Sequence, residues 1–164
     1  MLKKKFIKLF KKEYQEYKNL QKAANHKQEA IVENDIDELS SILSDEQNLL
    51  SDIKQLEKDR IDLLQKIAKE NNIETNDKQI SFNELVELFS DEEKKELRSI
   101  KDKLISILSE LEEINEANRK LIEDSLIINA QNFEMIRNAV KKDNTYSKPG
   151  KNNEDGDHYI DRKV

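Results

Sequence analysis

The chain has 164 residues, a length that suits one ordinary domain. Charged residues make up 39% and hydrophobic residues 35%, whereas an average globular domain has roughly 25% and 45–50%. The two glycines and the single proline all lie after residue 148. Folds that need glycine at turns or phosphate loops, such as β-sandwiches, Rossmann folds and P-loops, are therefore excluded. An all-α fold of long helices is predicted.

Net charge and cysteine content exclude further classes of function and of binding site. A formal charge of −6 argues against general nucleic-acid binding, which requires an excess of basic residues. Cysteine is absent, so disulfides and thiolate metal sites are excluded. Apolar runs are far too short to span a membrane, and the lysine-rich start lacks the apolar core and cleavage site of a signal peptide. We therefore expect a cytoplasmic protein.

The first predicted helix covers residues 2–33, where apolar residues recur at helical spacing. Its charge is uneven, because residues 1–12 hold six lysines and no acid while residues 28–53 hold eight acids and no base. Two interpretations of the lysines stay open. A basic amphipathic helix can lie on an anionic membrane surface, or the lysines can face acidic residues of a neighbouring helix.

A second helix is predicted over residues 35–71. Asp35 is placed to accept a hydrogen bond from the backbone N–H of Glu38, and Glu38 is placed to reach back to Asp35, as in a capping box. A regular heptad repeat of leucine and isoleucine follows, which is typical of a helix packed along a neighbour. The helix is expected to end at Asn71-Asn72, because asparagine tolerates the left-handed conformation that glycine usually supplies.

Two further helices are predicted, over residues 81–89 and 91–142. Each starts with a serine followed three residues later by a glutamate, which is the signature of a capping box. The two pairs are Ser81 with Glu84 and Ser90 with Glu93. The expected domain is thus an antiparallel bundle or coiled coil of three to four long helices over residues 1–142. Residues 143–164 are polar and are expected to form a flexible tail.

No constellation of residues indicates an enzyme or a metal site. His26 and Glu29 share one helix face, but a metal ion would need further converging ligands. Glu46 and Arg60 interrupt the apolar heptad positions, where charged residues more often set register or pair with a neighbouring helix than catalyse. No nucleophile lies near a base, so neither catalysis nor a cofactor is expected.

The lengths of the predicted helices point to a binding surface. At 1.5 Å per residue they measure about 48, 55 and 78 Å, so antiparallel packing leaves the last helix overhanging by roughly 20 Å. The overhang carries a broad apolar face with small or polar groups at its centre, which is a candidate docking surface for another helix. The residues assigned to this surface are Asn115, Asn118, Leu121, Ile122, Ser125, Leu126, Ile128, Asn132, Phe133, Met135, Ile136 and Val140. Alternatively, the helix breaks near Asn115–Asn118 and folds back as a fourth bundle helix, which would bury the same face.

Three segments carry a family likeness. The first is the sequence NDIDEL at residues 34–39 with the leucine-rich heptads up to residue 64, and the second is Asn115-x-x-Asn118-x-x-Leu121-Ile122. The third is Tyr146-Ser147-Lys148-Pro149-Gly150, a tyrosine with a glycine four residues later. Together, over about residues 30–150, they resemble the FlgN family of flagellar export chaperones. The chain departs from the family at Asn34, where glycine is common.

The resemblance implies a cytoplasmic, non-enzymatic chaperone that needs no cofactor. Such a protein binds the terminal helices of the hook–filament junction proteins, prevents their premature assembly and delivers them to the flagellar type III export gate. It also implies that a tyrosine in the tail docks at the export gate. In this chain the residues assigned to gate docking are Tyr146 and Gly150. The competing hypotheses are a coiled-coil scaffold without a client and a membrane-surface helical protein that uses Lys3 to Lys12.

Overall fold

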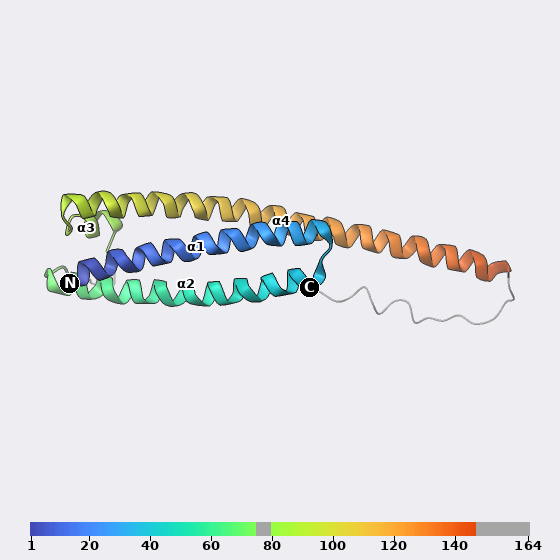
Figure 1. Ribbon diagram of the computed structural model, residues 1–164, viewed down its shortest axis with the longest axis horizontal. Coiled ribbons are helices and arrows are strands. Elements are labelled where there is room, and N and C mark those ends of the chain that lie inside the picture. Colours follow the sequence, from blue (N-terminus) through green and yellow to red (C-terminus); the bar gives the residue numbers. More distant parts are fainter. Residues whose placement is uncertain (75–79, 147–164) are drawn as a thin grey trace. The chain divides into compact units, whose positions relative to one another are not determined.

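The computed structural model describes residues 1–74 and 80–146, with side chains described as far as residue 142 (Figure 1). It contains four helices, namely α1 (Leu2–Glu33), α2 (Ile36–Glu70), α3 (Phe82–Val86) and α4 (Asp91–Tyr146). No strand occurs within these described ranges, and the predicted all-α class is confirmed. The chain divides into two compact units, Met1–Asn118 and Arg119–Val164, so the boundary falls inside α4.

In the first unit, α1 and α2 run antiparallel, and the first part of α4 lies along α1 (Figure 1). The core at one end is aromatic, because the Phe6 ring lies tilted against those of Phe10 and Phe89, with centroids 5.9 and 6.0 Å apart. Ile67 of α2 and Leu97 of α4 belong to the same buried cluster. A second cluster further along joins the three long helices through smaller aliphatic side chains.

Burial of the apolar side of α1 distinguishes between the two interpretations of its lysines. Phe6, Ile7 and Phe10 are nearly inaccessible, so the apolar side that a membrane-bound helix would insert is occupied by the bundle core. Lys11 instead forms an ion pair with Glu96 of α4, and Lys3 donates to the backbone carbonyl of the turn after α3. Some of the lysines therefore face neighbouring elements of the same unit, as the second interpretation expected.

The turn between α1 and α2 depends on Asn34, which adopts the left-handed conformation with φ at 56°. The next backbone N–H, that of Asp35, donates to the carbonyl of Ala30 at 2.9 Å and closes the end of α1. The Asp35 side chain accepts from the N–H of Glu38 at 3.0 Å, as predicted. The predicted return bond from Glu38 was wrong, because the N–H it required is already bonded to Ala30.

Substitution of Asn34 tests the strain in this turn. Asn34→Gly should keep or slightly raise the stability, whereas Asn34→Val should lower the free energy of unfolding by about 1–2 kcal/mol because a β-branched residue resists positive φ. Urea unfolding followed by circular dichroism measures both. Asn48→Val, at an exposed site inside α2, is the control for helix propensity. An equal loss in Asn34→Val and Asn48→Val would show that the turn imposes no special conformation.

The remaining helix boundaries follow the predicted signals closely. Asn72 adopts φ of 54° just after α2, which confirms an asparagine-terminated helix. Both serine–glutamate capping boxes form, with bonds of 3.1 and 3.3 Å at Ser81 and of 3.1 and 3.4 Å at Ser90. Helix α3 ends at Val86, earlier than predicted, because two tighter backbone turns follow and bring Phe89 into the core. Helix α4 continues past the predicted end at residue 142 to Tyr146.

Two ion pairs cross between α1 and α2 at heptad positions of α2. The Nε of Arg60 donates to Oε2 of Glu13 at 2.8 Å. The Nζ of Lys27 lies 2.9 and 3.0 Å from the two carboxylate oxygens of Glu46. The expectation that Glu46 and Arg60 pair with a neighbouring helix is confirmed, and their partners Glu13 and Lys27 both come from α1.

The surroundings of Glu13 place a polar cluster inside the α1–α2 interface. Burial raises the pKa of the Glu13 carboxyl above its ordinary value, although the nearby Arg60 guanidinium opposes the rise. One turn further along α1, the Tyr17 hydroxyl donates to Glu57 at 2.9 Å. Burial and this bond to a carboxylate raise the pKa of Tyr17 to about 12, so the phenol stays protonated at physiological pH.

Candidate binding surface

Beyond residue 118, α4 presents a dense series of exposed large apolar side chains. Their exposed fractions range from 44% for Phe133 to 70% for Met135. The series comprises Leu126, Ile127, Ile128, Phe133, Met135, Ile136 and Val140. Isolated exposed aliphatics are common on protein surfaces, whereas a group of this size on one helix is a candidate interaction site.

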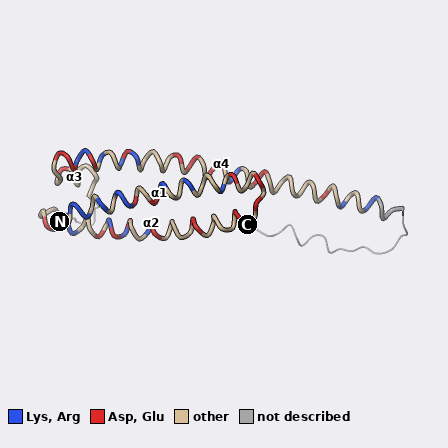
Figure 2. Tube along the Cα trace, viewed as in Figure 1, with Lys and Arg blue, Asp and Glu red and all other residues tan. Residues whose placement is uncertain are grey.

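The spacing of these residues places most of them on one broad side of the helix. Leu126, Phe133 and Val140 are seven residues apart and therefore project from the same side. Residues 125–133 contain no charged side chain, and Figure 2 shows this stretch in tan. Arg119 and Glu123 form an ion pair at 2.8 Å before the uncharged stretch begins. The surface is thus uncharged along residues 125–133 and has charged residues at its N-terminal border.

The predicted surface residues differ in their burial. Leu121, Ile122 and Ser125 are half-buried, whereas Asn115, Asn132 and the larger apolar members are exposed. Ile127 is also exposed, at 56%, but it was not predicted because it projects from a different side of the helix than Leu126, Phe133 and Val140.

Asn118 lies in the interior of the first unit and not on an open surface. It is only 2% exposed, and its Nδ2 donates to the backbone carbonyl of Ala24 in α1 at 3.0 Å. Its Oδ1 is buried and has no hydrogen-bond partner in the part of the chain that the structure describes. The available apolar surface therefore begins after Asn118.

The alternative of a break near Asn115–Asn118 was wrong. Helix α4 is continuous from Asp91 to Tyr146. Asparagine lowers helix propensity by less than about 1 kcal/mol, and the bond from Asn118 to Ala24 offsets part of that cost. Of the two residues predicted to dock at an export gate, Tyr146 is the last residue of α4 and Gly150 lies outside the described residues.

The described side chains can also be compared with the ligand sets that metal ions require. In residues 1–74 and 80–142, no three histidine or acidic side chains are grouped so as to hold a metal ion. His26 and Glu29, the pair considered from the sequence, are both exposed. Within the same ranges, no helix combines the length and the hydropathy needed to cross a bilayer.

The chain is similar in sequence to a known protein family. The family model described as FlgN protein matches residues 1–154, nearly the whole chain. The chain belongs to the FlgN family. Members of this family are flagellar export chaperones and not enzymes, and they are generally cytoplasmic. The FlgN-family chain is also 29% identical over 133 residues to "Uncharacterized protein YvyG" of Bacillus subtilis (strain 168), covering 80% of this chain and 76% of that protein. No solved structure matches it.

Proposed function

We propose that this FlgN-family chain is a cytoplasmic chaperone for the hook–filament junction proteins. It binds their terminal helices, prevents premature assembly and delivers them to the flagellar type III export gate. The observation that supports this proposal is the exposed apolar surface of α4 between residues 121 and 140, in a chain whose family acts in flagellar export. A client helix laid along this surface removes apolar area from water on both molecules.

The composition of the surface suits a carrier that must release its client. Most of its members are aliphatic, and Phe133 is its one aromatic side chain among residues 119–142. Tight interfaces usually depend on tryptophan, tyrosine and arginine anchors in enclosed pockets. A largely aliphatic helix face buries apolar surface in the complex without providing such anchors. The complex should therefore be specific but reversible.

Calorimetric titration of the full chain with purified hook–filament junction proteins tests the proposal. Binding is expected with a negative heat-capacity change, because apolar surface is buried. The matched controls are the same junction proteins without their terminal helices, and flagellin as another helical export substrate. Absence of binding, or equal binding after the terminal helices are deleted, would contradict the proposed function.

Delivery is proposed to depend on Tyr146, separately from client capture. A tyrosine ring can fill a pocket while its hydroxyl bonds at the rim, so one residue can anchor a short docking segment. Tyr146→Ala should weaken docking at the gate by about tenfold and reduce client secretion, while client affinity stays unchanged. Client binding in vitro and client level in the culture medium measure the two steps. Normal secretion by Tyr146→Ala, or the same loss in the control Tyr159→Ala, would remove this role from Tyr146.

A further inference from the structure

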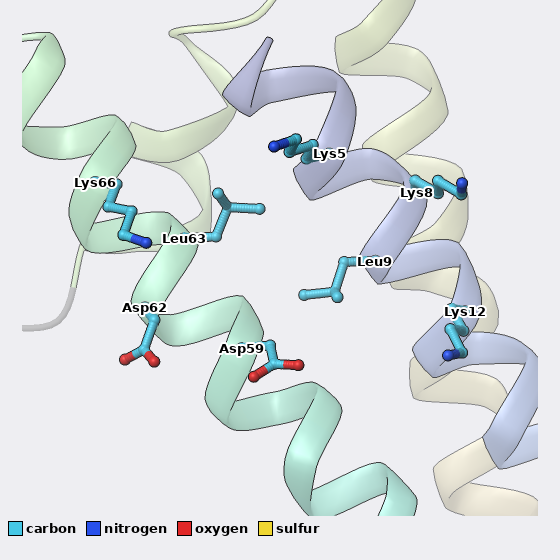
Figure 3. Close-up of a pocket in the computed structure, with 8 residues that line it drawn as sticks. All are labelled: Lys5, Lys8, Leu9, Lys12, Asp59, Asp62, Leu63 and Lys66. Atoms are coloured by element: carbon cyan, nitrogen blue, oxygen red, sulfur yellow. The ribbon is translucent and has the colours of Figure 1, made fainter.

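A groove between the start of α1 and the end of α2 forms a second candidate interaction surface, entirely within the first unit. It encloses about 450 Å³. Its lining consists of Lys5, Lys8, Leu9 and Lys12 from α1 and Asp59, Asp62, Leu63 and Lys66 from α2. Figure 3 shows Leu9 and Leu63 pointing toward one another across the groove, with the charged side chains around them. The groove thus has an apolar floor and charged rims.

The charges on the α1 rim are not neutralised within the described part of the chain. Lys11 pairs with Glu96 and Lys27 pairs with Glu46, but neither of these lysines lines the groove. Lys5, Lys8 and Lys12 form no ion pair among the described residues, and all three are exposed. Three unpaired positive charges in two turns of helix repel one another, so an acidic partner segment would relieve that repulsion.

The opposite rim carries two carboxylates, Asp59 and Asp62, and one lysine, Lys66. Figure 3 shows Asp59 and Asp62 toward the Lys12 end of the groove, whereas Lys66 lies toward the Lys5 end. An anionic membrane surface or a lone phosphate would meet these carboxylates unfavourably, and a membrane would also find Phe6 and Phe10 already buried. A helix with acidic residues over the three α1 lysines and basic residues over Asp59 and Asp62 would match the prevailing charge of each rim.

The floor of the groove also favours a helix. A large apolar side chain from a partner helix would insert between Leu9 and Leu63, which are both half-buried. Side chains of one helix that enter the groove between two others are the usual basis of helix packing. The partner would then lie along α1 and α2 as an additional helix of the bundle.

We propose that this groove binds an amphipathic helix of a partner protein, with acidic residues on the flank over α1, basic residues on the flank over α2 and an apolar stripe between them. The site lies in a different unit from the proposed client surface on α4. The chain would therefore hold a client and this second partner through separate residues, and either proposal can fail without the other.

Two synthetic helical peptides of about 20 residues test the proposal with the full chain. They share one leucine stripe, but the first has an acidic and a basic flank and the second has two basic flanks. Fluorescence anisotropy should show the first peptide bound about tenfold more tightly than the second, with a preference that salt weakens. The triple variant Lys5→Glu/Lys8→Glu/Lys12→Glu should reverse the preference, since its α1 rim is acidic.

The matched control is Lys4→Glu/Lys22→Glu/Lys103→Glu, which changes the net charge equally at exposed lysines outside the groove lining. This control should keep the wild-type preference. Equal binding of both peptides, binding of neither, or the same reversal in the control would overturn the proposal. Lysine-dependent binding of phosphatidylglycerol vesicles without a peptide preference would also overturn it, in favour of a membrane partner.

Discussion

Replacement of Arg60 by leucine is expected to lower the free energy of unfolding by about 3 kcal/mol. Glu13 is only 3% exposed, and Arg60 donates to its carboxylate at 2.8 Å. The variant leaves that carboxylate buried without its partner and also removes the guanidinium from above the Phe10 ring, 5.8 Å from the centroid. The Arg60 side chain is 31% exposed, so water near the pair should keep the loss at the low end of values for buried pairs.

The pH dependence of this variant identifies the cause of its loss. Burial raises the folded-state pKa of Glu13 above its ordinary 4.5, so the folded protein binds this proton more tightly than the unfolded chain does. The resulting stability is fully present below the unfolded pKa and is lost as the pH rises through the folded pKa. Without Arg60 the folded pKa rises further. The difference between Arg60→Leu and wild type should therefore shrink as the pH falls toward 4.5.

Urea unfolding followed by circular dichroism measures these effects. The double variant Glu13→Leu/Arg60→Leu should recover most of the lost stability, because no charge stays buried. Arg98→Leu, which removes a largely exposed guanidinium from α4, is the matched control and should cost less than about 0.5 kcal/mol. Equal losses in Arg60→Leu and Arg98→Leu, or a deficit that does not change with pH, would show that Glu13 does not depend on Arg60.

Phe133→Asp is expected to weaken client binding by about 2 kcal/mol or more, which is roughly thirtyfold. This prediction rests on the proposed client surface, where Phe133 lies between Leu126 and Val140 and supplies the one aromatic ring. An aspartate there loses the apolar contact and forces a charge to be desolvated in the complex. The free protein should stay folded, because Phe133 is exposed and lies outside the first unit.

Leu50→Asp is the matched control for that variant. Leu50 is an exposed leucine of α2, at 52%, so the substitution adds the same charge to a different helix. Calorimetry should show unchanged client affinity for Leu50→Asp, and circular dichroism should show unchanged helicity for both variants. Undiminished client binding by Phe133→Asp would remove the surface from the proposed function. An equal loss in Leu50→Asp would show that charge alone, and not the surface on α4, governs binding.

The helix boundaries could be predicted because their causes are local. Asn72 and the serines at residues 81 and 90 act within one helical turn, and the structure shows the expected caps. The bonding of the Asp35 N–H could not be predicted in the same way, because two helix ends compete for it. The left-handed backbone of Asn34 decides that competition by directing this N–H toward Ala30.

The binding surface was only partly predictable for a different reason. Asn118 and Asn132 occupy equivalent heptad positions, yet Asn118 is buried against α1 and Asn132 is exposed. A heptad pattern states which side of a helix is apolar, but not how far a neighbouring helix accompanies it. The groove between α1 and α2 was missed because it depends on which residues of the two helices lie at the same level.

The ion pairs between α1 and α2 also determine the relative direction and the register in which these two helices associate. The acid lies on α1 in the Glu13–Arg60 pair and on α2 in the Lys27–Glu46 pair, and the pairs are two heptads apart on both helices. A slip of two heptads in one direction would oppose Glu13 to Glu46, and in the other direction would oppose Lys27 to Arg60. Parallel alignment would create both clashes at once. The two ion pairs thereby favour a single antiparallel register of α1 and α2 over these alternatives.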